Sequence, residues 1–207
     1  MGRPVMSEST FSEQSLNLAK RWVSNCLVHP LCNTTVMQWY PTRLLDLGNI
    51  QEPNTDQIRL VHSEHCMLVG NYTTLSHRWG GQAHLRLTRH NLAALCQSID
   101  VRILPRTFRE AIQISRHLGA RYLWIDSLCI LQDPDDKSDW LQESSRMEQV
   151  YQHSYCNISA SDALDSTQGL FRSRSPAILQ PAIVSLNPKV RRSASSYISY
   201  TLEVYEM

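Results

Sequence analysis

The feature that most limits the fold of this chain is a helix pattern followed immediately by an apolar strand, residues 107–126. Thr107 and Glu110 have the spacing of a capping box, which predicts a helix start, and Gly119 suits the C-terminal end. The strand YLWID is apolar on both faces until Asp126, as in a central strand of a parallel sheet. Helix, short turn and buried strand make half of a doubly wound α/β unit. The helix at 107–118 has one apolar face, formed by Phe108, Ala111, Ile112, Ser115 and Leu118.

Hydrophobic spacing elsewhere predicts further elements of the same class. The sequence predicts one α/β domain with a mainly parallel sheet, helices on both faces and an N-terminal helical extension. The predicted helices are Phe11–Val28, Asn91–Ser98 and Ser138–Gln152, and the predicted strands are Arg43–Leu47, Ile58–Leu60, Cys66–Val69, Tyr72–Ser76 and 155–161.

Charge and hydropathy exclude several classes of function. The 207 residues include 20 basic and 19 acidic residues, giving a net charge of +1 with the two signs interspersed. This balance predicts no nucleic-acid partner. The apolar runs are too short to span a bilayer, and the first 15 residues have no signal-peptide core. We therefore expect a cytoplasmic protein with no membrane partner and with reduced cysteines.

Polar residues stand where two predicted strands end. Asp126 ends the strand YLWID, and Ser76 ends YTTLS, with His77 and Arg78 directly after it. Because ligands of open α/β sheets bind outside the carboxyl ends of the strands, these two strand ends mark a candidate site. The acidic run at 133–139 precedes a predicted helix and needs no ligand, since acidic residues near a helix N-terminus interact favourably with the helix dipole. Its spacing does not match an EF-hand calcium loop.

Glu143 lies in the middle of an apolar stripe on the predicted helix Ser138–Gln152, and the other residues of the stripe are Trp140, Met147, Val150 and Tyr151. A buried carboxylate needs a hydrogen bond or a charged partner, because burying it alone costs several kcal/mol. One interpretation is a structural ion pair with Arg78 or Arg121. The other is a site carboxylate that faces the strand ends.

Cysteine and histidine residues leave one metal alternative open. Cysteine and histidine are the usual zinc ligands, but the spacing here matches no standard zinc finger. Buried cysteines explain the presence of these residues equally well, so we predict no metal site. The residues concerned are Cys26, His29, Cys32, His62, His65 and Cys66.

A nucleophilic role for Cys129 is a second open alternative. A cysteine in a buried strand is usually an inert apolar residue, which is the simpler interpretation. The sequence has neither a glycine-rich phosphate-binding motif nor the G-x-S-x-G motif of serine hydrolases.

Two long blocks, YTTLSHRWGG at 72–81 and the segment 104–160, resemble the first two signature blocks of the fungal heterokaryon incompatibility (HET) domain. PTRLLDLG at 41–48 and GLFRSR at 169–174 also fit that family. The resemblance implies a protein of fungal non-self recognition whose domain triggers regulated cell death. It divides the chain into an N-terminal extension (1–40), the HET domain (41–175) and a tail (176–207) that lacks the third block of the family.

HET domains are in turn similar to TIR domains, which have a flavodoxin-like parallel sheet. LSHRWG at 75–80 resembles the segment that opens TIR domains. DWLQE at 139–143 resembles their tryptophan-to-glutamate helix segment, with a spacing one residue shorter than usual. In TIR enzymes that glutamate supports cleavage of NAD at the nicotinamide glycosidic bond. The resemblance therefore implies a flavodoxin/TIR-like sheet and NAD as a substrate.

The resemblance and the strand-end positions together assign candidate site residues. Glu143 and Asp126 are the candidate catalytic residues, since a carboxylate near the ribose stabilises the oxocarbenium character of the transition state. Among the cofactor-binding candidates, the arginine or the serine region would hold the pyrophosphate and the indole would stack on a base. These candidates are Ser76, Arg78, Trp79 and Gly80.

Two functions of different classes fit these observations. In the first, the chain is an NAD glycohydrolase that causes cell death and depends on Glu143. In the second, it is a non-catalytic signalling module that self-associates or docks to a protein partner. A third interpretation is an inactive remnant that lacks the third block.

Overall fold

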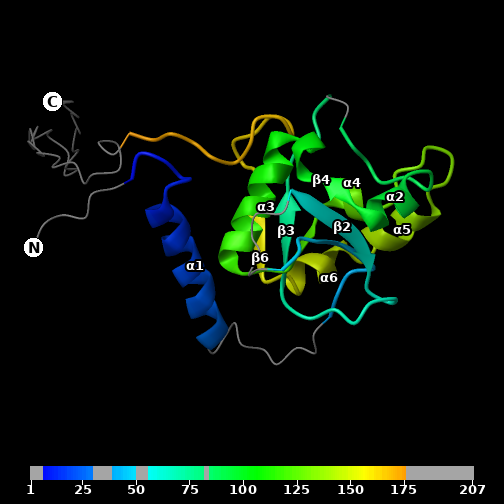
Figure 1. Ribbon diagram of the computed structural model, residues 1–207, viewed down its shortest axis with the longest axis horizontal. Coiled ribbons are helices and arrows are strands. Elements are labelled where there is room, and N and C mark those ends of the chain that lie inside the picture. Colours follow the sequence, from blue (N-terminus) through cyan, green and yellow to red (C-terminus); the bar gives the residue numbers. More distant parts are fainter. Residues whose placement is uncertain (1–6, 30–38, 50–55, 82–83, 176–207) are drawn as a thin grey trace, which may run out of the picture.

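The computed structural model describes residues 7–29, 39–49, 56–81 and 84–175. Within these residues six strands form one open sheet in the order β4-β2-β1-β5-β3-β6 (Figure 1). The strands are β1 Arg43–Asp46, β2 Gln57–His62, β3 Tyr72–Ser76, β4 Ile99–Asp100, β5 Tyr122–Trp124 and β6 Cys156–Ser159. The helices are α1 Glu13–Val28, α2 Leu92–Gln97, α3 Arg106–Leu118, α4 Asp126–Cys129, α5 Ser138–Ser144 and α6 Met147–Gln152, with a 3₁₀ turn at Val101–Ile103.

The α/β class is confirmed, but the prediction of a mainly parallel sheet is wrong. β3 is parallel to β5 and β6, whereas β1 is antiparallel to both β2 and β5, and β4 is antiparallel to β2. A parallel pair needs a crossover of about a dozen residues or more. Only residues 47–56 connect β1 to β2, while the crossovers between β3, β5 and β6 carry helices. The parallel pairing of a flavodoxin/TIR-like sheet is thus limited to β5-β3-β6.

Helices cover both faces of this parallel half, as the sequence predicts. On one face the hydroxyl of Thr73 lies 2.7 Å from that of Ser115 in α3. The next residue along the strand, Tyr72, donates its hydroxyl to the carbonyl of Val150 in α6 at 2.7 Å. Because successive strand side chains point to opposite faces, α3 and α6 lie on opposite sides of the sheet.

The predicted strand at Cys66–Val69 is not formed; these residues lie in a turn and irregular structure. Met67 is 96% exposed, so no neighbouring element buries its apolar side chain. β-Branched and apolar residues favour a strand only where a sheet packs against them.

The capping box predicted for α3 is also wrong, although Gly119 ends the helix in the left-handed conformation as expected. The helix begins one residue earlier, at Arg106, and Pro105 precedes it without a side-chain cap. Thr107 instead accepts a hydrogen bond from the Gly169 N–H at 3.0 Å, and Glu110 accepts from the N–H of Phe171 at 2.9 Å. Both side chains hold the loop at 166–171 on the helix.

The predicted helix Ser138–Gln152 is two helices, α5 and α6, separated by a turn at Ser145 and Arg146. The hydroxyls of Ser144 and Ser145 donate to the carbonyls of Leu141 and Gln142, three residues back, at 3.1 and 2.7 Å. Such bonds compete with the helical backbone and favour its termination.

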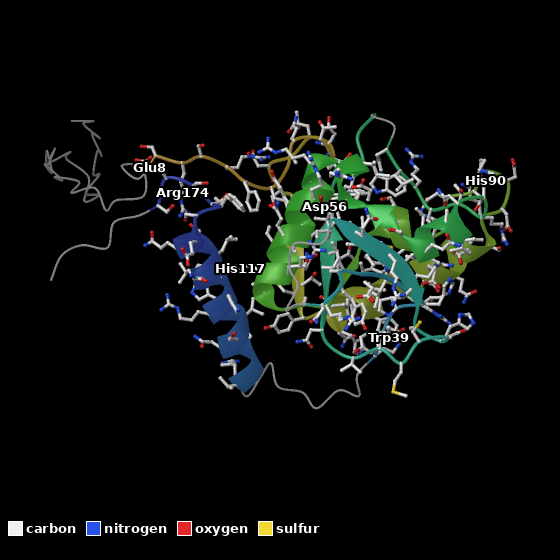
Figure 2. All side chains as sticks on the ribbon, viewed as in Figure 1. Glu8, Trp39, Asp56, His90, His117 and Arg174 are labelled. Atoms are coloured by element: carbon white, nitrogen blue, oxygen red, sulfur yellow. The ribbon has the colours of Figure 1, made fainter. Side chains whose placement is uncertain are left out.

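The helix predicted at Phe11–Val28 is confirmed as α1, which lies beside α3 (Figure 1). The segment before it runs along residues 172–174, and the backbone N–H of Arg174 donates to the carbonyl of Glu8 at 2.9 Å. Figure 2 shows Glu8 and Arg174 together at this end of the molecule. Phe11 and Phe171 add a ring contact with centroids 4.2 Å apart.

Candidate functional site

The carboxyl ends of β3 and β5 lie at the same edge of the sheet. Thr74 pairs in parallel with Trp124, so two residues further on Ser76 and Asp126 both lie at that edge. We call the residues gathered here the edge cluster; they are Ser76, His77, Trp79, Asp126 and Tyr151.

Asp126 is the centre of the edge cluster. Its carboxylate accepts hydrogen bonds from the indole N–H of Trp79 at 2.9 Å and from the backbone N–H of Ser127 at 2.7 Å. The structure thus brings together three candidate site residues, Ser76, Trp79 and Asp126. Trp79 also carries the guanidinium of Arg86 over its ring, 5.1 Å from the centroid. The indole is therefore held between a carboxylate and a cation.

His77 belongs to this cluster but is not among the predicted site residues. Its side chain is 1% exposed, and Nδ1 lies 4.0 Å from a carboxylate oxygen of Asp126. Burial lowers the pKa of His77, His84 lowers it further, and Asp126 opposes the effect only in part. Neither ring nitrogen has a hydrogen-bond partner within the described ranges. The sequence places His77 at the end of β3 with Ser76 and Arg78, but it does not reveal that the ring is buried beside Asp126.

Tyr151 of α6 reaches the same edge from the face of the sheet that lies opposite α3. Burial raises the pKa of its hydroxyl, and the negative charge of Asp126 raises it further, while a hydrogen bond with Ser76 lowers it. The sequence predicts Tyr151 only as part of an apolar helix face. Its site position depends on how α6 packs, which the sequence does not reveal.

The other two predicted cofactor-binding residues differ in their surroundings. Arg78 is exposed, and its side chain makes no hydrogen bond or ion pair within the described part of the chain. Gly80 has φ +69° and lies against Asp165, so that a Cβ atom at this position would collide with the aspartate side chain. Gly80 therefore allows the loop after β3 to pack against the loop that follows β6.

Glu143 lies apart from the edge cluster, in a cavity of about 350 Å³. The side chain is buried, with 4% of the residue exposed, and it accepts a hydrogen bond from the hydroxyl of Thr42 at 2.8 Å. We call this space the Glu143 cavity; its lining residues are Trp39, Tyr40, Thr42, Ser63, Glu64, Glu143, Arg146 and Gln149. Figure 2 labels Trp39, which lies at the border of the molecule.

The structural ion pair considered for Glu143 is not formed with either predicted partner. Arg121 binds Asp46 instead, with Nε 3.0 Å from the carboxylate. For the residues that the structure describes, the hydrogen bond from Thr42 is the one polar contact found for the Glu143 carboxylate. Its second oxygen is therefore available to a ligand in the cavity.

Cys129 is fully buried at the end of α4. Burial raises the pKa of its thiol to about 12, and the charges of Asp126 and Glu143 contribute to the increase. A thiol with this pKa stays protonated at neutral pH, so Cys129 is not a thiolate nucleophile.

The acidic run at 133–139 serves the structure, as predicted, through backbone N–H groups and through an ion pair with an arginine. Asp139 forms a 2.6 Å ion pair with the buried Arg43 and accepts from the backbone N–H of Leu131 at 2.8 Å. Asp136 accepts from the N–H of Ser138 at 2.9 Å at the start of α5. These contacts fix the loop between α4 and α5.

Among the described residues no group of three or more His, Cys, Asp or Glu side chains has the arrangement of a metal site. Cys32, one member of the metal alternative, lies outside those residues. Nor does any helix in the described ranges have the length and hydropathy needed to cross a membrane.

Comparison with protein families identifies the class of the chain. Residues 72–203 match the family model described as heterokaryon incompatibility protein (HET). Since the match spans more than half of the 207 residues, the chain belongs to the HET family, and its expected role is of the heterokaryon incompatibility type. The match begins at the start of β3 and therefore includes the edge cluster and Glu143. Comparisons with curated proteins and with solved structures gave no match.

Proposed function

We propose that this HET protein promotes regulated cell death by cleaving NAD at the bond between nicotinamide and ribose, with Glu143 as the catalytic carboxylate. The observation that carries the proposal is the Glu143 cavity. Glu143 is a buried carboxylate in the wall of a space lined by two aromatic rings. Thr42 binds one of its oxygens, and the other has no partner among the described residues. A buried carboxylate oxygen that faces such a space can stabilise positive charge on a bound ligand.

The chemistry follows from this position. The C1′–N bond breaks, nicotinamide leaves with the bonding electron pair, and the ribose gains oxocarbenium character. The negative charge of Glu143 stabilises that developing positive charge, and burial strengthens the interaction. Water then adds to C1′. One of its protons stays in the new C1′ hydroxyl group, and the other passes to solvent. No metal is needed for these steps.

The edge cluster has a supporting role in this proposal. Asp126 orders the loop after β3 through its hydrogen bond to Trp79. Ser76, Arg78, Trp79 and Gly80, the cofactor-binding candidates from the sequence, do not line the Glu143 cavity, so we assign them no contact with the nicotinamide half of the substrate.

The test is nicotinamide release from NAD by the purified chain, together with cell viability on expression. Glu143→Gln is expected to abolish release and toxicity together. Glu148→Gln is the matched control, since Glu148 lies on the exposed surface of α6. Toxicity that survives Glu143→Gln would count against the proposal.

A second candidate function is a non-catalytic module that signals by self-association. The observation in its favour is the apolar surface of α1, where Trp22 is 62% exposed. In this case toxicity would depend on Trp22→Ala and be insensitive to Glu143→Gln. A chain that stays monomeric at all working concentrations, measured by light scattering, would contradict it.

A further inference from the structure

The side chains around the Glu143 cavity carry charges of both signs next to aromatic rings. Glu64 and Glu143 contribute carboxylates, Arg146 contributes a guanidinium, and Trp39 and Tyr40 contribute rings. Carboxylates and aromatic faces together attract a cationic ring, whereas a guanidinium binds a phosphate through paired hydrogen bonds. The lining therefore suits a zwitterionic ligand with a cationic aromatic group at one end and a phosphate at the other.

The size of the cavity limits how much of a ligand it can enclose. Its volume of about 350 Å³ is near the lower end of the range of roughly 300–1,000 Å³ that small-molecule sites have. That space suits a single nucleotide and is too small to enclose a dinucleotide.

We propose that the Glu143 cavity binds only the nicotinamide, ribose and adjoining phosphate of its substrate, so that nicotinamide mononucleotide is cleaved about as well as NAD. This inference rests on the proposed function and adds its substrate class. The pyridinium ring lies by Trp39 and Tyr40, C1′ lies by Glu143, and the phosphate binds Arg146. The adenosine half of NAD remains outside the cavity and contributes little to recognition.

Arg146 is the residue that selects for the phosphate. It lies in the turn between α5 and α6, exposed to solvent, and makes no side-chain ion pair within the described ranges. Its guanidinium is thus available to an incoming phosphate without breaking an existing contact. Nicotinamide riboside, which has the same ring and sugar but no phosphate, would lose this interaction.

The experiment compares NAD, nicotinamide mononucleotide and nicotinamide riboside by the rate of nicotinamide release from the full chain. We expect kcat/KM for the mononucleotide to be within about tenfold of that for NAD. For the riboside we expect a decrease of about ten- to a hundredfold, the usual range for losing one charge-assisted hydrogen-bond pair.

The variant Arg146→Gln separates phosphate recognition from catalysis. It is expected to lower kcat/KM for the mononucleotide to that of the riboside and to leave the riboside unchanged. Arg59→Gln, an exposed arginine of β2 remote from the cavity lining, serves as the control and is expected to change neither. Cleavage of NAD without cleavage of the mononucleotide would overturn this inference alone. No release from any of the three substrates would overturn the proposed function as well.

Discussion

At the scale of single residues, the hydrogen bond from Thr42 to Glu143 joins the start of β1 to α5 across 101 positions of sequence. Thr42→Val removes the hydroxyl while nearly preserving the shape of the side chain. We expect a loss of about 1–3 kcal/mol of unfolding free energy, because a buried carboxylate loses its one described hydrogen bond. Urea denaturation measures the change, and Thr42→Ser is expected to stay close to the parent. A Thr42→Val midpoint equal to that of the parent would show that the bond contributes nothing.

Gly169 allows the loop after β6 to pack closely against α3. Its φ is +79°, and a Cβ atom would lie 2.6 Å from a carboxylate oxygen of Glu110 and 2.8 Å from Nε of Arg106. Gly169→Ala is therefore expected to cost more than about 1 kcal/mol of stability. Gly81→Ala is the matched control, because a Cβ atom there meets nothing within 4 Å. Thermal melts of both variants compare the two positions, and equal melting temperatures would contradict the account.

At the scale of elements, Glu110 attaches the loop at 166–171 to α3 and makes this contact sensitive to pH. Burial raises the pKa of Glu110, but hydrogen bonds from the N–H groups of Leu170 and Phe171 and the ion pair with Arg106 outweigh it, so the pKa lies below the ordinary value. Because the pKa of Glu110 is lower in the folded than in the unfolded state, its ionised carboxylate stabilises the folded state at neutral pH. This contribution is lost as the pH falls below about 4.3 and the carboxylate is protonated.

The lowered pKa of Glu110 leads to a prediction for the variant Glu110→Gln. The variant is expected to be less stable than the parent by about 2 kcal/mol at pH 7, since hydrogen bonds to a charged group are lost. The difference is expected to shrink as the pH falls from about 5 toward 2. Urea unfolding at several pH values tests this, with Glu148→Gln as the exposed control. A difference that does not depend on pH would mean that ionisation of Glu110 contributes nothing.

The sequence predicts those elements whose signals are local. Residues close together in the sequence are enough to predict the apolar face of α3, Gly119 at its end, the buried strand β5 and Asp126 at the sheet edge. Strand direction does not, because the antiparallel pairing of β1 with β5 depends on how distant segments meet. For the same reason Thr107 and Glu110 have the spacing of a cap but bind residues some 60 positions away. The Thr42–Glu143 contact has no sequence signal at all.

At the scale of the whole molecule, α1 lies beside α3, and the segment before it is hydrogen-bonded to residues 172–174. Within α1 none of the described side chains is fully buried. Removal of residues 1–29 is therefore expected to leave a domain that unfolds cooperatively, with a melting temperature lowered by only a few degrees. Calorimetry of the truncated chain tests this expectation, and loss of the cooperative transition would show that α1 belongs to the core.

The proposed activity of this HET protein depends on one cavity and on the carboxylate of Glu143 in its wall. The most direct measurement is nicotinamide release from NAD by the parent chain and by Glu143→Gln, both checked for cooperative unfolding, with Glu148→Gln as the control. We expect release by the parent and by the control, and none by Glu143→Gln. Absence of release from a folded parent at high protein concentration, or equal release by Glu143→Gln, would contradict the proposed activity.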